Sequence, residues 1–129
     1  DFKKDDYINI VQDLSAVTAA CFMTRKQLYI DMLGFDEKLA VAFNDVDFCL
    51  KVRTAKYLIV YNPFVEAYHY ESKSRGEDTE NSEKQKRFAK EYELFVKRWS
   101  KTIAKGDPYY NRNYRLDTDL PKINYNKIW

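Results

Sequence analysis

The stretch "AFNDVDFCLKVRTAKYLIVYNP", residues 42–63, predicts a helix followed by a strand. Asn44 is a residue type that favours the N-cap position, and Asp47 stands three residues later, where a capping-box acid reaches back. Apolar residues follow at helical spacing, so we expect a helix over residues 45–56. The next run, "YLIVYNP", is rich in β-branched and aromatic residues and ends at Pro63, which stops a strand.

The triplet Asp45-Val46-Asp47 has the D-x-D pattern that binds divalent metals in many enzymes. On a helix, side chains two positions apart point about 200° apart around the axis, so these two carboxylates do not converge on one ion. We therefore reject the pair as the principal metal site. Asp45 instead stands at the first turn, where the macrodipole favours an ionised carboxylate that can accept a proton from a substrate hydroxyl. The alternative that both aspartates only cap the helix stays open.

The chain of 129 residues has the composition of a globular domain, with 45% hydrophobic, 16% aromatic and 33% charged residues. Its net charge of +2 gives no indication of a nucleic-acid partner. No apolar run approaches the roughly 20 residues that span a bilayer, and no signal peptide opens the chain. Cys21 and Cys49 stand in apolar surroundings, which predicts two buried reduced thiols and a cytosolic setting.

Three further segments have recognisable patterns. The apolar run "VTAACFM", residues 17–23, predicts a buried strand. Thr24 then stands as a helix N-cap, with Gln27 at the capping-box spacing, and the helix is expected to end at Gly34 in a left-handed conformation. The segment "FVEAYHYE", residues 64–71, alternates sides and predicts a second short strand or extended segment.

The clearest helix is predicted over residues 82–103, with lysines opposite its apolar face as a solvated surface. The tail, residues 106–129, is expected to wrap over the body as an ordered loop. Strands and helices together make an α/β organisation. The apolar face of the long helix consists of Phe88, Tyr92, Phe95, Val96, Trp99 and Ile103.

Several motifs follow one another along nearly the whole chain: "AVTAACFMTRKQL", "LGFDEKLAVAFNDVDFCLKV", "YLIVYNPFVEAYHYESKSRG", "RFAKEYELFVKRW" and "GDPYYNRN". In this order they resemble the acceptor-binding half of family 2 glycosyltransferases, the inverting enzymes of the GT-A fold, in the bacterial polysaccharide and O-antigen type subgroup. The resemblance implies an α/β, partial GT-A-like (nucleotide-diphospho-sugar transferase) fold with residues 1–129 as a single partial domain. Within it, residues 14–76 are the acceptor-site and catalytic segment, 77–105 the C-terminal helix and 106–129 the wrapping tail. We expect the nucleotide-binding half upstream of residue 1, and the chain inactive without it.

The resemblance also implies roles for individual residues. Asp45 is the general base that deprotonates the acceptor hydroxyl, and His69 is an imidazole ligand of a divalent metal, Mn²⁺ or Mg²⁺. A structural histidine and a solvated loop after it remain alternatives. The implied substrate-binding residues are Phe35, Asp36, Glu37, Asn44 and Asp47 on the acceptor side, and Ser72, Lys73, Ser74 and Arg75, whose hydroxyl and cationic groups suit phosphate oxygens.

Three departures from the family pattern concern backbone geometry. Leu33 precedes Gly34 where the family usually has Gly-Gly, and Arg112 stands where a proline is common. Lys56 follows Ala55 where Ala-Gly is frequent. Because glycine takes the left-handed conformation most easily, we expect a less favourable sharp helix end at residue 56.

These features predict the C-terminal part of an inverting glycosyltransferase. It would move a sugar from a nucleotide-diphosphate donor to a hydroxyl of a glycan or lipid-linked acceptor in cell-surface polysaccharide synthesis. We expect it in the cytoplasm or peripherally on the inner face of the membrane. Eleven tyrosines leave a second interpretation open, a non-catalytic carbohydrate- or protein-binding module. A third is a structural piece that forms a dimer through an exposed apolar edge.

Overall fold

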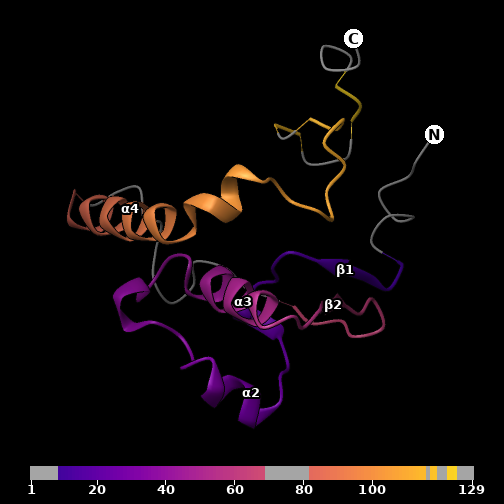
Figure 1. The fold of residues 1–129 in the computed structure, drawn as a ribbon, viewed down its shortest axis with the longest axis horizontal. Helices are drawn as coiled ribbons and strands as arrows, with labels where there is room; N and C mark the ends of the chain where they lie inside the picture. The colour runs from indigo at the N-terminus through magenta and orange to yellow at the C-terminus, as the bar shows by residue number, and fades with distance from the viewer. Residues whose placement is uncertain (1–8, 69–81, 116, 119–121, 125–129) are drawn as a thin grey trace.

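The computed structural model describes residues 9–68, 82–115, 117–118 and 122–124. In Figure 1, α3 lies between α4 and α2, and the paired strands extend beyond the end of α3. The described part is a mixed α and β structure in which helices dominate. In chain order its elements are β1 (Gln12–Leu14), η1 (Ala19–Cys21), α2 (Lys26–Asp31), η2 (Glu37–Leu39), α3 (Asn44–Thr54), β2 (Ile59–Tyr61) and α4 (Ser82–Ala104).

The sheet consists of β1 and β2, which pair antiparallel with Asp13 opposite Val60. The prediction of a strand within "YLIVYNP" is confirmed by β2. The strand predicted at residues 17–23 is wrong: this segment contains η1, and its neighbour β1 forms the partner of β2. Thr18 explains the difference, because its hydroxyl oxygen accepts a hydrogen bond from the backbone N–H of Ala20 and turns the chain locally.

The extended segment predicted at residues 64–71 is not a strand in the part that the structure describes, residues 64–68. Phe64 lies in a turn, where its N–H donates to the side-chain oxygen of Asn62 (3.0 Å). This asparagine turn comes directly after β2, and residues 65–68 form no strand after it.

Helix α2 begins later than predicted, since Arg25 is its N-cap and Thr24 makes no cap. Its predicted end at Gly34 is wrong: α2 ends at Asp31 with Met32 as its C-cap, and the left-handed residue after the cap is Leu33 (φ +60°). Gly34 follows, also with positive φ (+58°), and a Cβ at this position would lie 2.8 Å from the ring of Tyr29. Glycine is therefore required here both by backbone conformation and by the close approach of the tyrosine.

Helix α3 confirms the predicted helix, but its first turn differs. The N-cap is Phe43 in a left-handed conformation (φ +64°), and Asn44 is the first helical residue. The predicted Asn44 cap is wrong because α4 holds the preceding residue: the ring of Phe43 stacks on that of Phe95, with centroids 5.0 Å apart. Tertiary packing therefore selects where this helix begins.

The opposite end of α3 is a Schellman motif. Lys56 N–H donates to Arg53 C=O (2.9 Å) and Tyr57 N–H donates to Val52 C=O (3.2 Å). Lys56 takes φ +68°, so the sharp helix end forms although lysine replaces the glycine that suits it.

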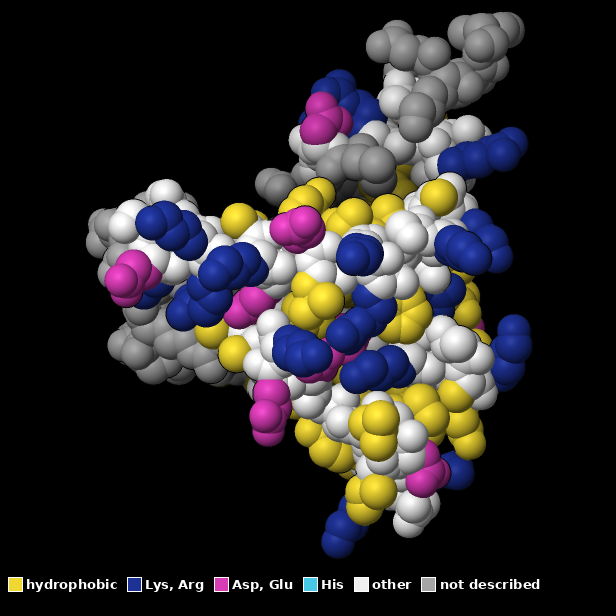
Figure 2. Space-filling model, turned by 60° about the vertical axis from the view of Figure 1, so that its left-hand side comes forward, with side chains coloured by type: hydrophobic (Ala, Val, Ile, Leu, Met, Phe, Trp, Pro, Cys, Tyr) yellow, Lys and Arg dark blue, Asp and Glu magenta, His cyan; other side chains and the backbone are white. Residues whose placement is uncertain are grey.

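Helix α4 agrees with the predicted helix to within one residue at its C-terminal end, and packs against α3 and η2. Leu39, Leu50 and Phe95 form the buried core between these elements. The apolar face of α4 is only partly covered, because Phe88 and Tyr92 remain about half exposed. Figure 2 shows hydrophobic side chains reaching the surface between Lys and Arg side chains. No helix in the described part of the chain combines the length and apolar character needed to cross a membrane.

The other side of α3 carries a cluster of aromatic rings, formed by Phe22, Tyr29, Phe35 and Phe48, with centroids 5.2–5.9 Å apart. Cys49 lies beside this cluster in the sequence and is buried as predicted, whereas the burial predicted for Cys21 is wrong. Cys21 is exposed because η1 turns its side chain outward instead of placing it in a strand.

The described residues of the tail pair mainly with one another. Tyr114 and Ile123 form an isolated antiparallel bridge, and Tyr110 Oη donates to the backbone oxygen of Arg115 (2.6 Å). Contact with the body runs through Ser15, whose hydroxyl donates to Asp107, and through Arg53, whose guanidinium lies over the ring of Tyr109. Figure 1 shows this segment beyond the end of α4, on the side of β1.

Replacing Leu39 with alanine is expected to lower the free energy of unfolding by about 3 kcal/mol, because the side chain is fully buried and a cavity would remain. Urea denaturation followed by circular dichroism measures this loss. Leu58→Ala is the matched control, since Leu58 is 61% exposed and its truncation should change stability by less than about 1 kcal/mol. Equal losses in the two variants would show that Leu39 is not part of the core.

Candidate functional site

Asp45, the predicted base, lies in the first turn of α3 with its side chain partly exposed. Its Oδ2 accepts a hydrogen bond from the backbone N–H of Ala19 (3.1 Å), and its Oδ1 accepts one from the N–H of Val46 (2.8 Å). The neighbouring Asn44 accepts from the N–H of Asp45 itself (2.7 Å). A carboxylate has about four acceptor positions, so two backbone donors fix its orientation and leave room for a donor from outside.

The loop before α3 is held by α4, through a carboxylate that the sequence analysis missed. Glu91 is only 4% exposed, and its Oε2 accepts from the N–H groups of Ala42 (2.6 Å) and Val41 (3.3 Å). Its other oxygen, Oε1, lies 3.7 Å from Arg87 Nε. Glu91 stands within the apolar face of α4, four residues before Phe95, and this position was the available sequence signal. Because it ties down two residues just before α3, it also limits where Asp45 can move.

Asp47 faces the opposite way and is completely buried. Its Oδ1 accepts hydrogen bonds from Arg98 Nη1 (2.7 Å) and Trp99 Nε1 (2.8 Å), both on α4. Its Oδ2 lies 2.8 Å from Lys51 Nζ, a charge contact without regular hydrogen-bond geometry. Burial raises the pKa of this carboxyl, but the Lys51, Arg98 and Trp99 donors together outweigh it and hold the pKa below its ordinary value. Burial of this carboxylate does not favour the acceptor contact predicted for Asp47.

Arg98 extends the same ion pair to Asp36, one of the predicted acceptor residues. Arg98 Nη2 lies 2.6 Å from Asp36 Oδ2, while Asp36 Oδ1 accepts from the N–H of Lys38 (2.9 Å). The backbone donor of Lys38 and then the guanidinium lower the pKa of Asp36. Its carboxylate therefore joins η2 to α4.

The remaining residues of the predicted acceptor turn differ in exposure. Phe35 contributes its ring to the aromatic cluster beside α3, and its N–H donates to Tyr29 Oη (3.3 Å). Glu37 opens η2 and is exposed. Of the predicted acceptor residues, the structure thus brings Asn44 next to Asp45, and links Asp36 with Asp47 through Arg98.

The predicted metal ligand and phosphate donors cannot be placed relative to Asp45. His69, Ser72, Lys73, Ser74 and Arg75 all lie outside the described residues. Among the residues that are described, no group of three or more His, Cys, Asp or Glu side chains is arranged to hold a metal ion. The divalent metal stays a prediction from the resemblance.

Comparison with known proteins shows two similar sequences. The chain is 46% identical over 112 residues to the uncharacterized protein y4gI of Sinorhizobium fredii, a match of 85% of this chain and 12% of that protein. It is 30% identical over 102 residues to the O-antigen biosynthesis protein RfbC of Myxococcus xanthus, covering 78% of this chain and 8% of that protein. The chain therefore spans only a small part of the length of both relatives. No family model matches the chain, and no solved structure matches it.

Replacing Asp47 with asparagine is expected to lower the free energy of unfolding by about 3 kcal/mol at pH 7, because Lys51 and Arg98 lose their buried counter-charge. A carboxyl whose pKa is lowered on folding stabilises the protein above the pKa of the unfolded chain, about 3.8, and loses that contribution as the pH falls through its folded pKa. The stability difference between the two proteins should thus be constant from about pH 5 to 8 and shrink below about pH 4. Urea denaturation at each pH measures it.

Asp31→Asn is the control for this series, since Asp31 lies exposed on α2 and accepts only from Gln27 among the described side chains (2.8 Å). It should change stability by less than about 1 kcal/mol. A difference between wild type and Asp47→Asn that grows on acidification would contradict the lowered pKa of Asp47.

Proposed function

We propose that this chain is the acceptor-side part of an inverting glycosyltransferase that acts in bacterial cell-surface polysaccharide synthesis. The observation that carries the proposal is the Asp45 carboxylate, partly exposed and held by two backbone N–H groups at the start of α3. The similarity to a protein named for O-antigen biosynthesis supports the class of product. The GT-A fold, the nucleotide-sugar donor and a glycan or lipid-linked acceptor belong to the same proposal.

In this reaction Asp45 accepts the proton of one acceptor hydroxyl. The hydroxyl oxygen forms a bond to the anomeric carbon of the donor sugar on the face opposite the nucleotide diphosphate. The bond from that carbon to the diphosphate oxygen breaks at the same time, the nucleotide diphosphate leaves with the electron pair, and the anomeric configuration inverts. A general base works when it lies within about 2.6–3.2 Å of the hydroxyl oxygen. The anchored carboxylate needs little reorganisation to reach this geometry.

A divalent Mn²⁺ or Mg²⁺ ion, with His69 as one of its ligands, is the cofactor that the resemblance adds to this proposal. A cation of this kind supplies charge that stabilises a departing diphosphate. Imidazole and oxygen ligands suit such ions. Deprotonation of the acceptor by Asp45 does not depend on it.

A second candidate function is a non-catalytic module that binds carbohydrate. It is favoured by the exposure of aromatic side chains after β2, where Phe64 is 84% and Tyr68 92% exposed. Aromatic rings of this kind stack on sugar faces and pack in interfaces. In this case binding would need neither nucleotide nor metal.

Asp45→Asn in the complete protein is expected to reduce kcat for sugar transfer by about 10²- to 10⁴-fold, because an amide does not accept the proton. The KM for the acceptor should change little, since asparagine keeps the shape of the side chain. Release of nucleotide diphosphate in the presence of acceptor measures both constants. Asp31→Asn, which also removes one aspartate charge but on α2, should keep wild-type turnover. Wild-type kcat in Asp45→Asn would remove Asp45 as the base.

Calorimetric titration of the 129-residue chain separates the two functions. Binding of an oligosaccharide without nucleotide sugar or Mn²⁺, and loss of that binding in Tyr68→Ala with Asp45→Asn unaffected, would favour the binding module. Weak or absent glycan binding by the chain, together with turnover by the complete protein, would favour the transferase.

A further inference from the structure

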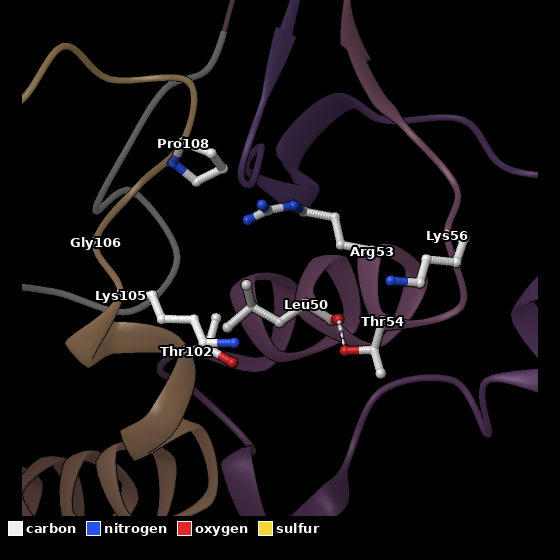
Figure 3. Close-up of a pocket in the computed structure, with 8 residues that line it drawn as sticks. All are labelled: Leu50, Arg53, Thr54, Lys56, Thr102, Lys105, Gly106 and Pro108. Atoms are coloured by element: carbon white, nitrogen blue, oxygen red, sulfur yellow. Dashed lines mark hydrogen bonds between the residues drawn. The ribbon is translucent and has the colours of Figure 1, made fainter.

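A pocket of about 350 Å³ lies between the end of α3 and the segment that follows α4. Figure 3 shows the side chains that line it. Leu50 and Pro108 supply its apolar surface. The pocket is at the other end of α3 from Asp45, which lies nine residues and therefore about 13 Å from Thr54 along the helix axis. It is thus separate from the proposed catalytic carboxylate.

Three cationic side chains line this pocket: Arg53, Lys56 and Lys105. In Figure 3, Lys56 and Lys105 extend from opposite sides toward the space beside Leu50, and Arg53 crosses above it. No Asp or Glu is among the residues that line the pocket. Within the described ranges, none of the three cations forms an ion pair with a carboxylate. Their positive charge is therefore available to an anion.

Arg53 is oriented by neutral partners. Its Nη1 donates to the hydroxyl of Ser15 (2.8 Å), and its guanidinium carbon lies 5.2 Å from the centre of the Tyr109 ring. The nearby carboxylate of Asp107 instead accepts from the Ser15 hydroxyl and from the N–H of Tyr109. These contacts hold the guanidinium in place without neutralising it, which is the arrangement that favours binding of an oxyanion.

Lys56 is the second cationic contact of the pocket. Cations at the end of a helix also offset the macrodipole, and this accounts for Arg53 in the last turn of α3. It does not account for a lysine in the left-handed conformation (φ +68°), where glycine is the unstrained residue. Leu33 and Phe43 also take positive φ beside helix ends, so the conformation alone assigns no role to Lys56. Its side chain is a contact of the pocket because it lines the cavity together with Arg53 and Lys105. Thr102 adds a hydroxyl, whereas the hydroxyl of Thr54 already donates to the backbone oxygen of Leu50 (2.8 Å).

We propose that this pocket binds a phosphate or diphosphate group, with Arg53, Lys56 and Lys105 as its cationic contacts. The site goes beyond the proposed transferase reaction and does not depend on Asp45. Two sources present this chemistry, a soluble nucleotide diphosphate and the phosphate of a lipid headgroup.

The test is calorimetric titration of the 129-residue chain with inorganic pyrophosphate at constant ionic strength. Saturable binding is expected, and Lys105→Gln should weaken it at least 5-fold. Lys97→Gln removes the same charge from an exposed position of α4 outside the pocket and should leave the affinity unchanged. Equal weakening by both variants, or no saturable binding to the wild type, would overturn the proposal.

Lys56→Gly separates binding from folding. Glycine relieves the left-handed backbone, so the variant should melt at a higher temperature than the wild type while binding pyrophosphate at least 5-fold more weakly. Unchanged affinity in this variant would also overturn the site.

Two further titrations identify the source of the phosphate. Uridine diphosphate is compared with vesicles of phosphatidylcholine that contain phosphatidic acid, and with vesicles of phosphatidylcholine alone. Tighter binding of the nucleotide assigns the pocket to a soluble diphosphate, and tighter binding of the acidic vesicles assigns it to a lipid phosphate. Binding of neither, or equal binding of both kinds of vesicle with none of the nucleotide, would contradict recognition of an anionic phosphate group, because phosphatidylcholine has no net charge.

Discussion

The rest of the described structure depends on the hydrogen bonds and ion pairs made by the buried carboxylate of Asp47. It receives Arg98 and Trp99 from α4 and Lys51 from its own helix. An isolated buried charge is very unfavourable, so the carboxylate is stable only while α4 stays docked with these donors in place. Arg98 in turn brings Asp36 to the same junction, which ties the turn before η2 to both helices.

A second buried carboxylate, that of Glu91, connects the same two helices but belongs to α4 instead of α3. Asp47 on α3 binds donors from α4, whereas Glu91 on α4 binds backbone N–H groups of the loop that leads into α3. The stacked rings of Phe43 and Phe95 lie between them and add apolar contact. The two helices are therefore locked by polar contacts at both sides of a small core. As a result, the first turn of α3, which carries Asp45, has a fixed position.

This arrangement gives the two aspartates of the D-x-D triplet different roles. Since they point to different sides of α3, one is buried against α4 and the other reaches the backbone of η1. Helical spacing already predicted from the sequence that the two carboxylates point apart, and the structure confirms this. It follows that the same helix can hold a buried ion pair, an accessible carboxylate at its start and a cationic pocket at its end without conflict between them.

The sequence by itself determined the elements whose patterns are local and strong. Helical spacing predicted α3 and α4, and β-branched residues predicted β2, because each depends on neighbours within a few residues. Only the tertiary structure decided the partner of β2, the helix start at Phe43, the burial of Glu91 and the exposure of Cys21. For the candidate site, the position of Asp45 in the first turn of α3 was predictable from the sequence, but the groups that hold its carboxylate were not. Ala19 lies 26 residues away from it, and contacts over such separations depend on how the elements pack, which a local pattern does not encode.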